Sequence, residues 1–312
     1  MGQTSSDKTD IRFIDLFAGI GGFHVALSAE GGRCVFASEW DEKARLTYWS
    51  NFRLLEPELF GIGPEDSTGL FAGDITEVTR NKKTIKARIP DFDVLCAGFP
   101  CQPFSNAGLR KGFEENRGTL FWNILDILDA RKPEAYFLEN VRGLDSHMSG
   151  NRKTIEIIEE ELAKIGYSFQ KIYVKASNHG LPQHRPRLFM IGFKSSRKAA
   201  RFKQLSENFQ SKPLKTNMSK ILGGHVPRDI GLTLRVGGRG SGVNDRRNWD
   251  CYLVDGHEVQ LEPRHALEMQ GFPKKFKFPT GVSKTQAMKQ AGNSVAVAAV
   301  QDYASMLFEV LK

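Results

Sequence analysis

The sequence contains few cysteines and no long hydrophobic run. Its four cysteines, Cys34, Cys96, Cys101 and Cys251, show neither the spacing of metal ligands nor a disulfide framework. This pattern predicts no metal site and indicates a reducing, cytoplasmic setting. No apolar run approaches the roughly 20 residues of a membrane helix, and the polar segment 1–10 lacks the apolar core of a secretory signal. We therefore expect a soluble globular protein that contacts no membrane.

Basic residues are unevenly distributed along the 312-residue chain, whose formal net charge is +8. Residues 194–250 hold 13 of the 44 lysines and arginines but only 4 of the 36 acidic residues, so this segment carries the whole positive excess. A clustered basic surface is typical of proteins that contact nucleic-acid phosphates. A merely solvated surface is the alternative, and the composition leaves both open.

The N-terminal region has the pattern of a strand, a glycine turn, a helix and a second strand. The turn contains Gly19, Gly21 and Gly22. Glu39 follows the second strand, 20 residues after Gly19, the spacing at which an acid reaches a ribose hydroxyl in Rossmann-like folds. His24 stands where a dinucleotide fingerprint has its third glycine. The pattern therefore favours a nucleoside ligand without a pyrophosphate over the alternative, a nicotinamide dinucleotide.

Cys101 follows an apolar run, residues 93–98, with the pattern of a buried parallel strand. Ligands of open α/β sheets bind at the carboxyl ends of the strands. A thiol at such an end, followed by a loop over residues 104–117 that contains Gly108 and Gly112, suggests a nucleophile with a mobile cover. The alternative is that Cys101 is a small buried hydrophobe, as most free cysteines are.

Apolar periodicity along the chain predicts an α/β fold. Strands are expected over residues 11–17, 34–38, 93–98, 135–138, 168–176 and 187–194, and helices over 23–30, 41–52, 119–130, 154–165, 263–270 and 285–312. The last two strands leave no room for a crossover helix, so we expect an antiparallel hairpin at the edge of the sheet. Glycine-rich loops are expected to dominate the basic segment that follows.

Further polar residues lie at predicted strand or turn positions. Glu139 directly follows the fourth strand, and a carboxylate buried there would need a partner; the alternative is that it faces water. Arg185 and Arg187 lie two apart at a strand start, so we expect them to face the same side. Asp74, beside the apolar Ile75, would suit an adenine amino group, with a turn cap as the alternative.

Five blocks of the sequence, in this order, closely resemble the DNA (cytosine-5)-methyltransferases of bacterial restriction-modification systems. They are DLFAGIGGF at 15–23, GFPCQ at 98–102, ENV at 139–141, QHRPR at 183–187 and GNSV at 292–295. The resemblance implies a Rossmann-like, S-adenosylmethionine-dependent methyltransferase sheet with a smaller, loop-rich target-recognition domain. On this basis we expect residues 1–210 plus 286–312 to form the catalytic domain and residues 211–285 to form the recognition domain and hinge.

The same resemblance implies roles for individual residues. Cys101 would be the nucleophile, and Glu139, Arg185 and Arg187 would hold the cytosine. The S-adenosylmethionine site would be formed by Phe17, Gly19, Gly21, Gly22, Glu39, Trp40, Asp74, Ile75, Pro100, Leu120, Asn293 and Val295. The expected DNA contacts are Arg117, Thr233, Arg235, Arg239, Arg246 and Arg247.

The implied reaction explains why these side chains are needed. A thiolate that adds to C6 of cytosine makes C5 nucleophilic enough to accept a methyl group, and Glu139 would protonate or hydrogen-bond ring N3. Because C5 is inaccessible inside a duplex, the base must flip out. We expect a monomer that acts on double-stranded DNA in the bacterial cytoplasm, with a cognate restriction endonuclease as a candidate partner.

Two alternatives remain within nucleic-acid proteins. A tRNA cytosine-5 methyltransferase could use the same scaffold, but the separate basic, glycine-rich segment favours duplex DNA, because reading a groove needs such a module. A nucleic-acid-binding relative without catalysis is disfavoured because Cys101, Glu139 and Arg185 are all present.

Overall fold

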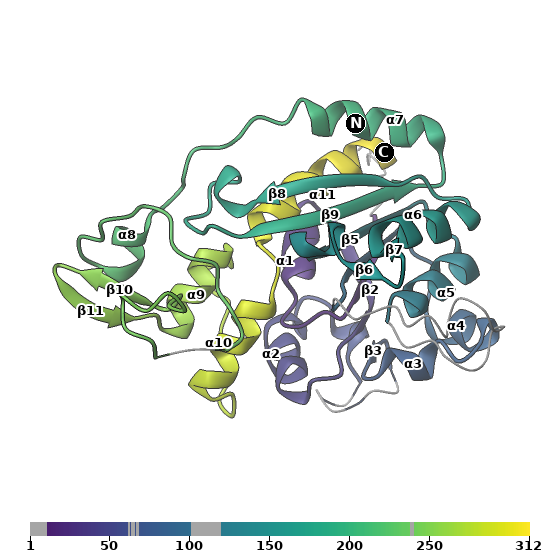
Figure 1. Ribbon diagram of the computed structural model, residues 1–312. Helices are drawn as coiled ribbons and strands as arrows, with labels where there is room; N and C mark the ends of the chain where they lie inside the picture. Colours follow the sequence, from purple (N-terminus) through teal and green to yellow (C-terminus); the bar gives the residue numbers. More distant parts are fainter. Residues whose placement is uncertain (1–10, 62, 64–65, 67–68, 101–119, 238–239) are drawn as a thin grey trace, which may run out of the picture.

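A seven-stranded sheet, in the order β3-β2-β1-β4-β5-β9-β8, forms the centre of the computed structural model (Figure 1). The structure describes residues 11–61, 63, 66, 69–100, 120–237 and 240–312. The strands are β1 (Arg12–Leu16), β2 (Arg33–Ser38), β3 (Phe71–Ala72), β4 (Val94–Gly98), β5 (Ala135–Val141), β8 (Gln170–Lys175) and β9 (Pro186–Phe193). The first five are parallel, whereas β9 runs antiparallel to β5 and β8. The predicted edge hairpin is thus confirmed.

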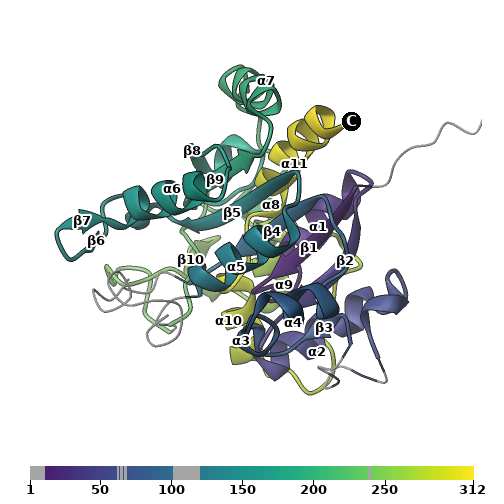
Figure 2. The same ribbon diagram turned by 90° about the vertical axis from the view of Figure 1, so that its right-hand side faces the viewer.

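Helices cover both faces of this sheet (Figure 2), because its strands are apolar on both sides. In β1, Phe13 packs in one hydrophobic cluster and the next residue, Ile14, packs in the other, as the alternation of side chains along a strand requires. The first cluster includes residues of α1 (Gly22–Ala29), α2 (Glu42–Phe52), α7 (Ser196–Glu207) and α11 (Val297–Leu311). The second includes residues of α3 (Ile75–Val78), α4 (Lys82–Arg88), α5 (Phe121–Arg131) and α6 (Thr154–Lys164).

The strand order reverses between β1 and β4. The chain passes from β1 through β2 to β3 at one edge, and then returns to β4 beside β1. At such a point the connections leave the sheet in opposite directions, and the crevice between them is where open α/β sheets bind ligands. The glycine turn follows β1 and Pro100 follows β4, so both predicted motifs adjoin this crevice.

A smaller group of elements lies at one end of the sheet (Figure 1). It contains α8 (Met218–Leu222), β10 (Cys251–Val254), β11 (His257–Gln260), α9 (Pro263–Gln270) and α10 (Lys284–Asn293), and we call it the small lobe. Its core includes the buried Trp249 and Met269. Met288 and Ala291 of α10 belong to this core, whereas α11 packs against α1. The segment 286–312, which the sequence assigned to the catalytic domain, therefore contributes to both lobes.

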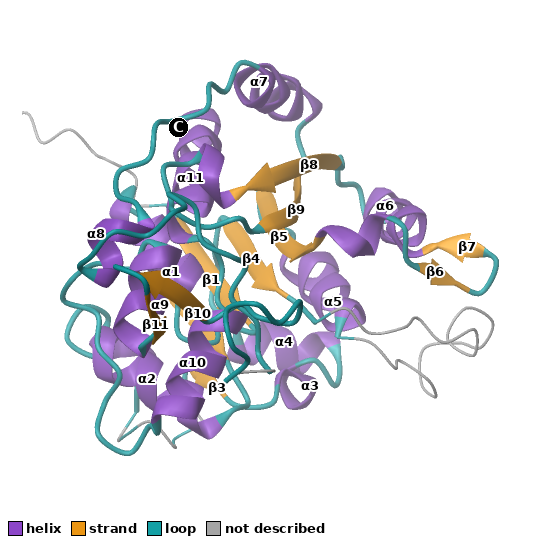
Figure 3. Ribbon diagram, turned by 60° about the vertical axis from the view of Figure 1, so that its left-hand side comes forward, coloured by secondary structure: helices purple, strands orange, loops and turns teal. Residues whose placement is uncertain are grey.

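Loops connect the elements of the small lobe (teal in Figure 3), as its glycine content predicted. The short helix α8 and the hairpin of β10 and β11 were not predicted. We call the seven-stranded sheet and the helices that cover it the large lobe. Short elements connect its strands and helices: η1 (Pro57–Leu59), η3 (Arg142–Asp145), η4 (Ala176–Asn178), β6 (Met148–Ser149) and β7 (Arg152–Lys153).

Helix α7 corrects the expectation that loops dominate the basic segment from its start. The Ser195 side chain accepts the Lys198 N–H and caps the helix, and Phe202 is fully buried. Basic residues on its outer face have acidic partners in the large lobe: Lys198 pairs with Glu134 at 3.0 Å, and Arg201 with Glu309 at 2.8 Å. The basic segment is therefore divided between the two lobes and does not form one surface.

One stretch, Lys284–Leu311, is long and apolar enough by composition to cross a membrane. It is an exception to the expectation that no apolar run approaches that length. The stretch comprises two helices, α10 and α11, and 67% of its most apolar part is buried within the protein. These residues are apolar because they fill the cores of the two lobes.

Candidate active site

The glycine turn after β1 combines strained backbone with close packing. Phe17 has φ +54° and Gly19 has φ +56°, a region that a bulky side chain rarely adopts and that is typical of functional loops. A Cβ atom on Gly22 would stand 2.6 Å from Val295 Cγ2, whereas one on Gly19 would meet no atom within 4 Å. Gly22 is thus needed for packing, and Gly19 borders open space into which a ligand can fit.

Glu39 lies immediately after β2 and is 8% exposed. Its Oε2 atom accepts the Gly19 N–H at 2.7 Å, and its Oε1 atom accepts the Asp41 N–H at 2.8 Å. Burial raises the pKa of Glu39, and the two backbone hydrogen bonds act in the opposite direction. Each oxygen still has a free lone pair, so the carboxylate is fixed beside the glycine turn and can accept further hydrogen bonds there.

Other residues of the predicted cofactor set have different environments. Trp40 is 82% exposed, and Ile75 is buried in the core. Asp74 accepts the Thr76 N–H at 2.9 Å, so it caps α3, which is the alternative role that the sequence left open. Phe17 and Leu120 are half-buried, and Pro100 and Asn293 are exposed. Gly21 has φ +87°, and a Cβ atom there would stand too close to the Phe52 ring.

Val295, from the turn between α10 and α11, brings the distant motifs together. Cβ atoms on Gly22 and Gly98 would stand 2.6 Å and 3.8 Å from its side chain, although these glycines follow or end different strands. A Cβ on Gly98 would also stand 3.7 Å from Glu139 Oε2. The ends of β1, β4 and β5 and the GNSV block therefore converge at the crevice.

Glu139 and Arg187 form a nearly buried ion pair across β5 and β9. The Arg187 Nε atom lies 2.8 Å from Glu139 Oε1. This is a charge contact without good hydrogen-bond geometry, because among the described residues no donor is directed at Oε1. Glu139 is only 8% exposed, so the alternative in which it faces water is wrong. Oε1 is enclosed by the protein, so Oε2, on the side of Gly98, is the oxygen through which this carboxylate can exchange a proton or a hydrogen bond with a ligand.

Arg185 has other partners than Arg187, although we expected the two side chains to face the same way. Its guanidinium group donates to the carbonyl oxygens of Leu234 at 3.4 Å, Gly292 at 3.0 Å and Ser294 at 2.5 Å. Burial lowers the pKa of Arg185 to about 9, which still leaves it charged at neutral pH. Arg185 therefore joins backbone segments of the small lobe and of the turn before α11.

Asn140 was part of the ENV block but received no role from the sequence. It is buried, and its Nδ2 atom donates to the Phe99 carbonyl at 2.9 Å. This bond fixes the chain two residues before Cys101. The sequence did contain a signal for this role, because a side-chain amide at the end of a buried strand needs a hydrogen-bond partner. Cys101, the loop 104–117, Arg117 and Arg239 lie outside the described residues.

The other predicted DNA contacts differ in their availability. Arg235 and Arg246 are exposed on the small lobe. Arg247 forms an ion pair with Asp245 at 2.9 Å, and its hydrogen bonds lower the pKa of Asp245 to about 2. The Thr233 hydroxyl donates to the His184 carbonyl. The exposed Arg235 and Arg246 are thus the described members of this set that remain open to a ligand.

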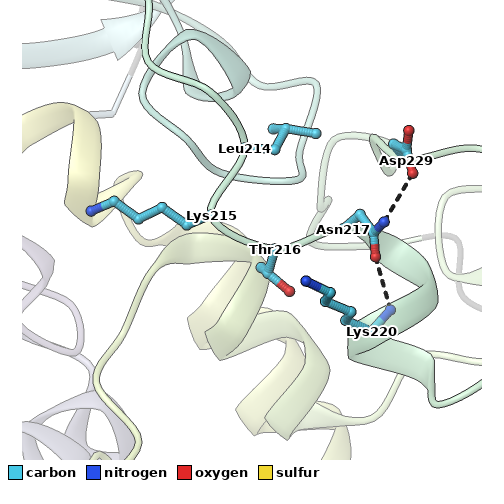
Figure 4. A pocket seen from close by; sticks show the side chains of 6 residues that line it. All are labelled: Leu214, Lys215, Thr216, Asn217, Lys220 and Asp229. Carbon is cyan, nitrogen blue, oxygen red and sulfur yellow. Dashed lines mark hydrogen bonds between the residues drawn. The ribbon is translucent and has the colours of Figure 1, made fainter.

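A separate polar hollow of about 170 Å³ opens where the chain enters α8 (Figure 4). It is lined by Leu214, Lys215, Thr216, Asn217, Lys220 and Asp229. Asn217 spans it, accepting the Lys220 N–H and donating to Asp229 Oδ1, both at 3.0 Å. None of the predicted site residues lines this hollow. Within the described ranges, no group of three or more His, Cys, Asp or Glu side chains is placed to hold a metal ion.

Titratable side chains are buried beneath the glycine turn. His24 lies 2.7 Å from the Tyr48 hydroxyl through Nδ1, and its ring stacks on Phe52 with centroids 3.9 Å apart. Burial lowers the pKa of His24 to about 3 and raises the pKa of Asp15. Both shifts favour the neutral forms, because a charge is costly in this environment.

Comparison with known proteins gives a consistent result across sequence and structure. The sequence profile of the C-5 cytosine-specific DNA methylases matches residues 11–236 and 233–309. The chain is 36% identical to the Type II methyltransferase M.HhaI of Haemophilus parahaemolyticus, over 94% of this chain and 93% of that protein. It is 38% identical to the Type II methyltransferase M.HpaII of Haemophilus parainfluenzae, over 97% and 91%.

Solved structures share the fold at lower sequence identity. The Dnmt2 methyltransferase of S. pombe superimposes with a TM-score of 0.69 at 20% identity, covering 97% of this chain and 99% of that one. A putative DNA modification methyltransferase encoded within an E. coli prophage gives 0.65 at 22% identity, covering 97% and 99%. These likenesses support the predicted Rossmann-like sheet.

Proposed function

The chain belongs to the C-5 cytosine-specific DNA methylase family and is a DNA (cytosine-5)-methyltransferase, and from this we propose how it acts. It transfers a methyl group from S-adenosylmethionine to C5 of a cytosine flipped out of a specific double-stranded DNA sequence, through a covalent adduct between Cys101 and C6. The observation that carries the proposal is the buried Glu139–Arg187 pair beside the end of β4.

Cys101 acts as the nucleophile. Its thiolate forms a bond to C6, and the electron pair of the C5–C6 double bond moves into the ring, so that C5 becomes nucleophilic and N3 becomes basic. S-adenosylmethionine, when bound, supplies the methyl group that C5 takes up. A water molecule is the candidate base that then removes the C5 proton. The double bond re-forms as the thiolate leaves.

Glu139 and Arg187 manage the charge on the flipped base. Glu139 gives a proton or a strong hydrogen bond to N3 as the thiolate adds, and takes it back when the thiolate leaves. Oε1 is enclosed beside Arg187, so Oε2, which lies on the side of Gly98 at the end of β4, is the oxygen proposed to meet the base. Arg187, 2.8 Å away, can hold the base carbonyl and the carboxylate together. Arg185 is a positioning residue in this scheme, since backbone carbonyls accept hydrogen bonds from both of its terminal nitrogens.

The cofactor is proposed to bind along the glycine turn. The open space at Gly19 suits a nucleoside, and the Glu39 carboxylate beside it can accept ribose hydroxyls. Phe17, held at positive φ, would stack on the adenine, and the exposed Trp40 would cover the adenosine. The residues present fit a nucleoside without a pyrophosphate, because the third glycine of the dinucleotide pattern is replaced by the buried His24.

The DNA is proposed to lie between the crevice and the small lobe. Arg235 and Arg246 are exposed and can contact phosphates or bases. Such contacts would help to offset the cost of flipping, a few kcal/mol for one pair. We further propose that the enzyme acts as a monomer in the bacterial cytoplasm, with a restriction endonuclease of the same specificity as its partner.

A mechanism-based trap tests the proposal. Bisulfite sequencing of DNA treated with the enzyme first identifies the methylated site. With S-adenosylmethionine present, a duplex with 5-fluorocytosine at that site should then give a covalent complex that survives denaturing electrophoresis, because after methyl transfer C5 carries fluorine in place of the proton whose loss would release the thiol. Peptide mass spectrometry should locate the adduct at Cys101.

The control variants separate the nucleophile from other thiols. Cys101→Ser should form no adduct and no methylated DNA. Cys251→Ser, which changes a buried cysteine of the small lobe, should form the adduct as the wild type does. Methylation by the wild type without any adduct at position 101 would overturn the covalent mechanism.

A further inference from the structure

Three buried polar side chains meet where the small lobe joins the sheet. Gln183 and Gln270 are fully buried, and Arg185 is 2% exposed. Gln183 and Arg185 precede β9, and Gln270 ends α9. Polar groups in this environment are costly unless all their hydrogen bonds are made, so their partners define what the junction holds in place.

The Gln183 amide connects three segments. Its Oε1 atom accepts the Leu234 N–H at 3.1 Å, and its Nε2 atom donates to the Met269 carbonyl at 3.2 Å and to Gln270 Oε1 at 3.1 Å. Arg185 donates to the Leu234 carbonyl at 3.4 Å. Both backbone groups of Leu234 are therefore held by side chains of the loop before β9.

Gln270 extends these contacts to the turn before α11. Its Nε2 atom donates to the Ala291 carbonyl at 2.8 Å and to the Ser294 carbonyl at 3.1 Å. Arg185 binds the same Ser294 carbonyl. One set of hydrogen bonds thus includes the small lobe, the loop before β9, and the turn whose Val295 lies against Gly22 and Gly98.

The segment 231–235 is enclosed between these parts. On one side, the His184 N–H donates to the Gly231 carbonyl at 2.8 Å, and the Gly231 N–H donates to the Pro182 carbonyl at 2.9 Å. On the other side, a Cβ on Gly292 would stand 2.6 Å from the Arg235 carbonyl oxygen. Exposed side chains, those of Arg235 and Val236, come directly after the enclosed Leu234.

We infer that Gln183 and Gln270 are positioning residues that set the place of segment 231–236 relative to the Glu139–Arg187 pair, and thereby determine how strictly the enzyme discriminates its target sequence from near matches. This inference rests on the proposed function. The loop that holds Leu234 continues within two residues into Arg187, so a displacement of the segment also displaces the arginine that contacts Glu139. Recognition of the DNA sequence and binding of the flipped base are therefore coupled through the buried side-chain amides of Gln183 and Gln270.

The readout must separate positioning from folding. A variant that only unfolds part of the protein lowers the concentration of active enzyme equally for every substrate. The ratio of kcat/KM on the target duplex to kcat/KM on a duplex with one base pair changed is independent of that concentration. This selectivity ratio therefore changes only if the geometry of the active molecules has changed.

We would measure the selectivity ratio for Gln183→Met, Gln270→Met and the double variant. Methionine keeps a similar length, but at position 183 it cannot accept the Leu234 N–H or donate to Gln270 Oε1, and at position 270 it cannot donate to the Ala291 and Ser294 carbonyls. Each single variant should lose about tenfold in selectivity, the value of one buried hydrogen bond. The double variant should lose little more than either single variant, because both changes break one shared network. Gln204→Met, on the exposed face of α7, is the matched control and should keep the wild-type ratio.

A second variant covers the case in which methionine prevents folding. In Gln183→Glu the new side chain still accepts the Leu234 N–H. As an ionised carboxylate, however, it has no hydrogen to donate to Gln270 Oε1. Its selectivity, relative to wild type, should be closer to normal at pH 6 than at pH 8, since a protonated carboxyl group can donate again.

Two results would overturn the inference. One is a wild-type selectivity ratio in the single variants together with reduced kcat; the other is additive losses in the double variant. Absence of methylation by the wild-type enzyme on any duplex would instead contradict the proposed function itself. The two failures are therefore distinguishable in one experiment.

Discussion

Glu39 and Glu139 stand near the carboxyl ends of two parallel strands, and each is 8% exposed, yet their surroundings differ. Both oxygens of Glu39 accept backbone N–H groups, one from Gly19 and one from Asp41. Glu139 contacts the charged Arg187, but no described donor is directed at its Oε1 atom. Burial alone would make the two residues equivalent, and the hydrogen-bond partners distinguish them.

The difference corresponds to two kinds of work. A carboxylate held by rigid backbone groups keeps one position and one charge state, which suits the recognition of hydroxyl groups. A carboxylate paired with a side-chain cation through one oxygen, with its second oxygen outside that pair, can change its hydrogen bonds during a reaction. We therefore propose that the half of the crevice formed by β1 and β2 binds the cofactor, and that the half formed by β5 and β9 carries the chemistry.

The largest effect is expected for Glu139→Gln. The amide cannot supply a proton to N3, so the single-turnover rate of methyl transfer should fall by about 100-fold or more. Affinity for S-adenosylhomocysteine should stay within about twofold, because the residue lies outside the glycine turn. Rapid-quench kinetics with a labelled methyl donor and calorimetric titration would measure these quantities.

The control for this variant is Glu156→Gln, which changes an exposed glutamate on α6. It should match the wild type in both measurements. If Glu139→Gln lost cofactor affinity but kept its rate at saturation, Glu139 would be a structural residue and the comparison between the two glutamates would fail.

The opposite pattern is expected for Glu39→Gln. Its amide nitrogen would face the N–H of either Gly19 or Asp41, so one backbone hydrogen bond and one acceptor for a ribose hydroxyl are lost. Affinity for the cofactor should fall by about tenfold, whereas the rate with saturating cofactor should remain near that of the wild type. The same titration and quench experiments apply, and a large loss of rate at saturation would contradict the division of labour.

Local features of the site were predictable from sequence, and long-range ones were not. The glycine turn, Glu39 and Glu139 were found because glycine spacing and a polar residue after an apolar run are local signals. The partners of Arg185 could not be found, because they belong to Leu234, Gly292 and Ser294, far along the chain.

The same distinction applies to the fold. Strongly patterned strands such as β1 and β4 were predicted with nearly correct bounds. Helix α7 was missed because its apolar stripe is narrow, with Phe202 buried and Leu205 partly buried among many charges. The division of α10 and α11 between two cores depends on packing partners, which periodicity does not specify.

The smallest effect concerns acid stability beneath the first half of the crevice. The folded protein holds the pKa of His24 at about 3, well below its usual value of 6.5. Between about pH 3 and pH 6.5, His24 is protonated in the unfolded chain but stays neutral in the folded protein. The free energy of unfolding should therefore fall as pH decreases below about 6.5. The slope due to this residue can approach about 1.4 kcal/mol per pH unit.

His24→Gln removes this titration while its amide can still reach the Tyr48 hydroxyl. Urea unfolding between pH 4.5 and 7 should therefore show a weaker loss of stability on acidification for the variant than for the wild type. The raised pKa of Asp15 acts in the opposite direction, stabilising the fold at low pH. It is present in both proteins, so it largely cancels from the difference. The matched control is His257→Gln, which changes an exposed histidine. If the free energy of unfolding of His24→Gln fell with pH as steeply as that of the wild type, the buried imidazole would not be the source of the acid sensitivity.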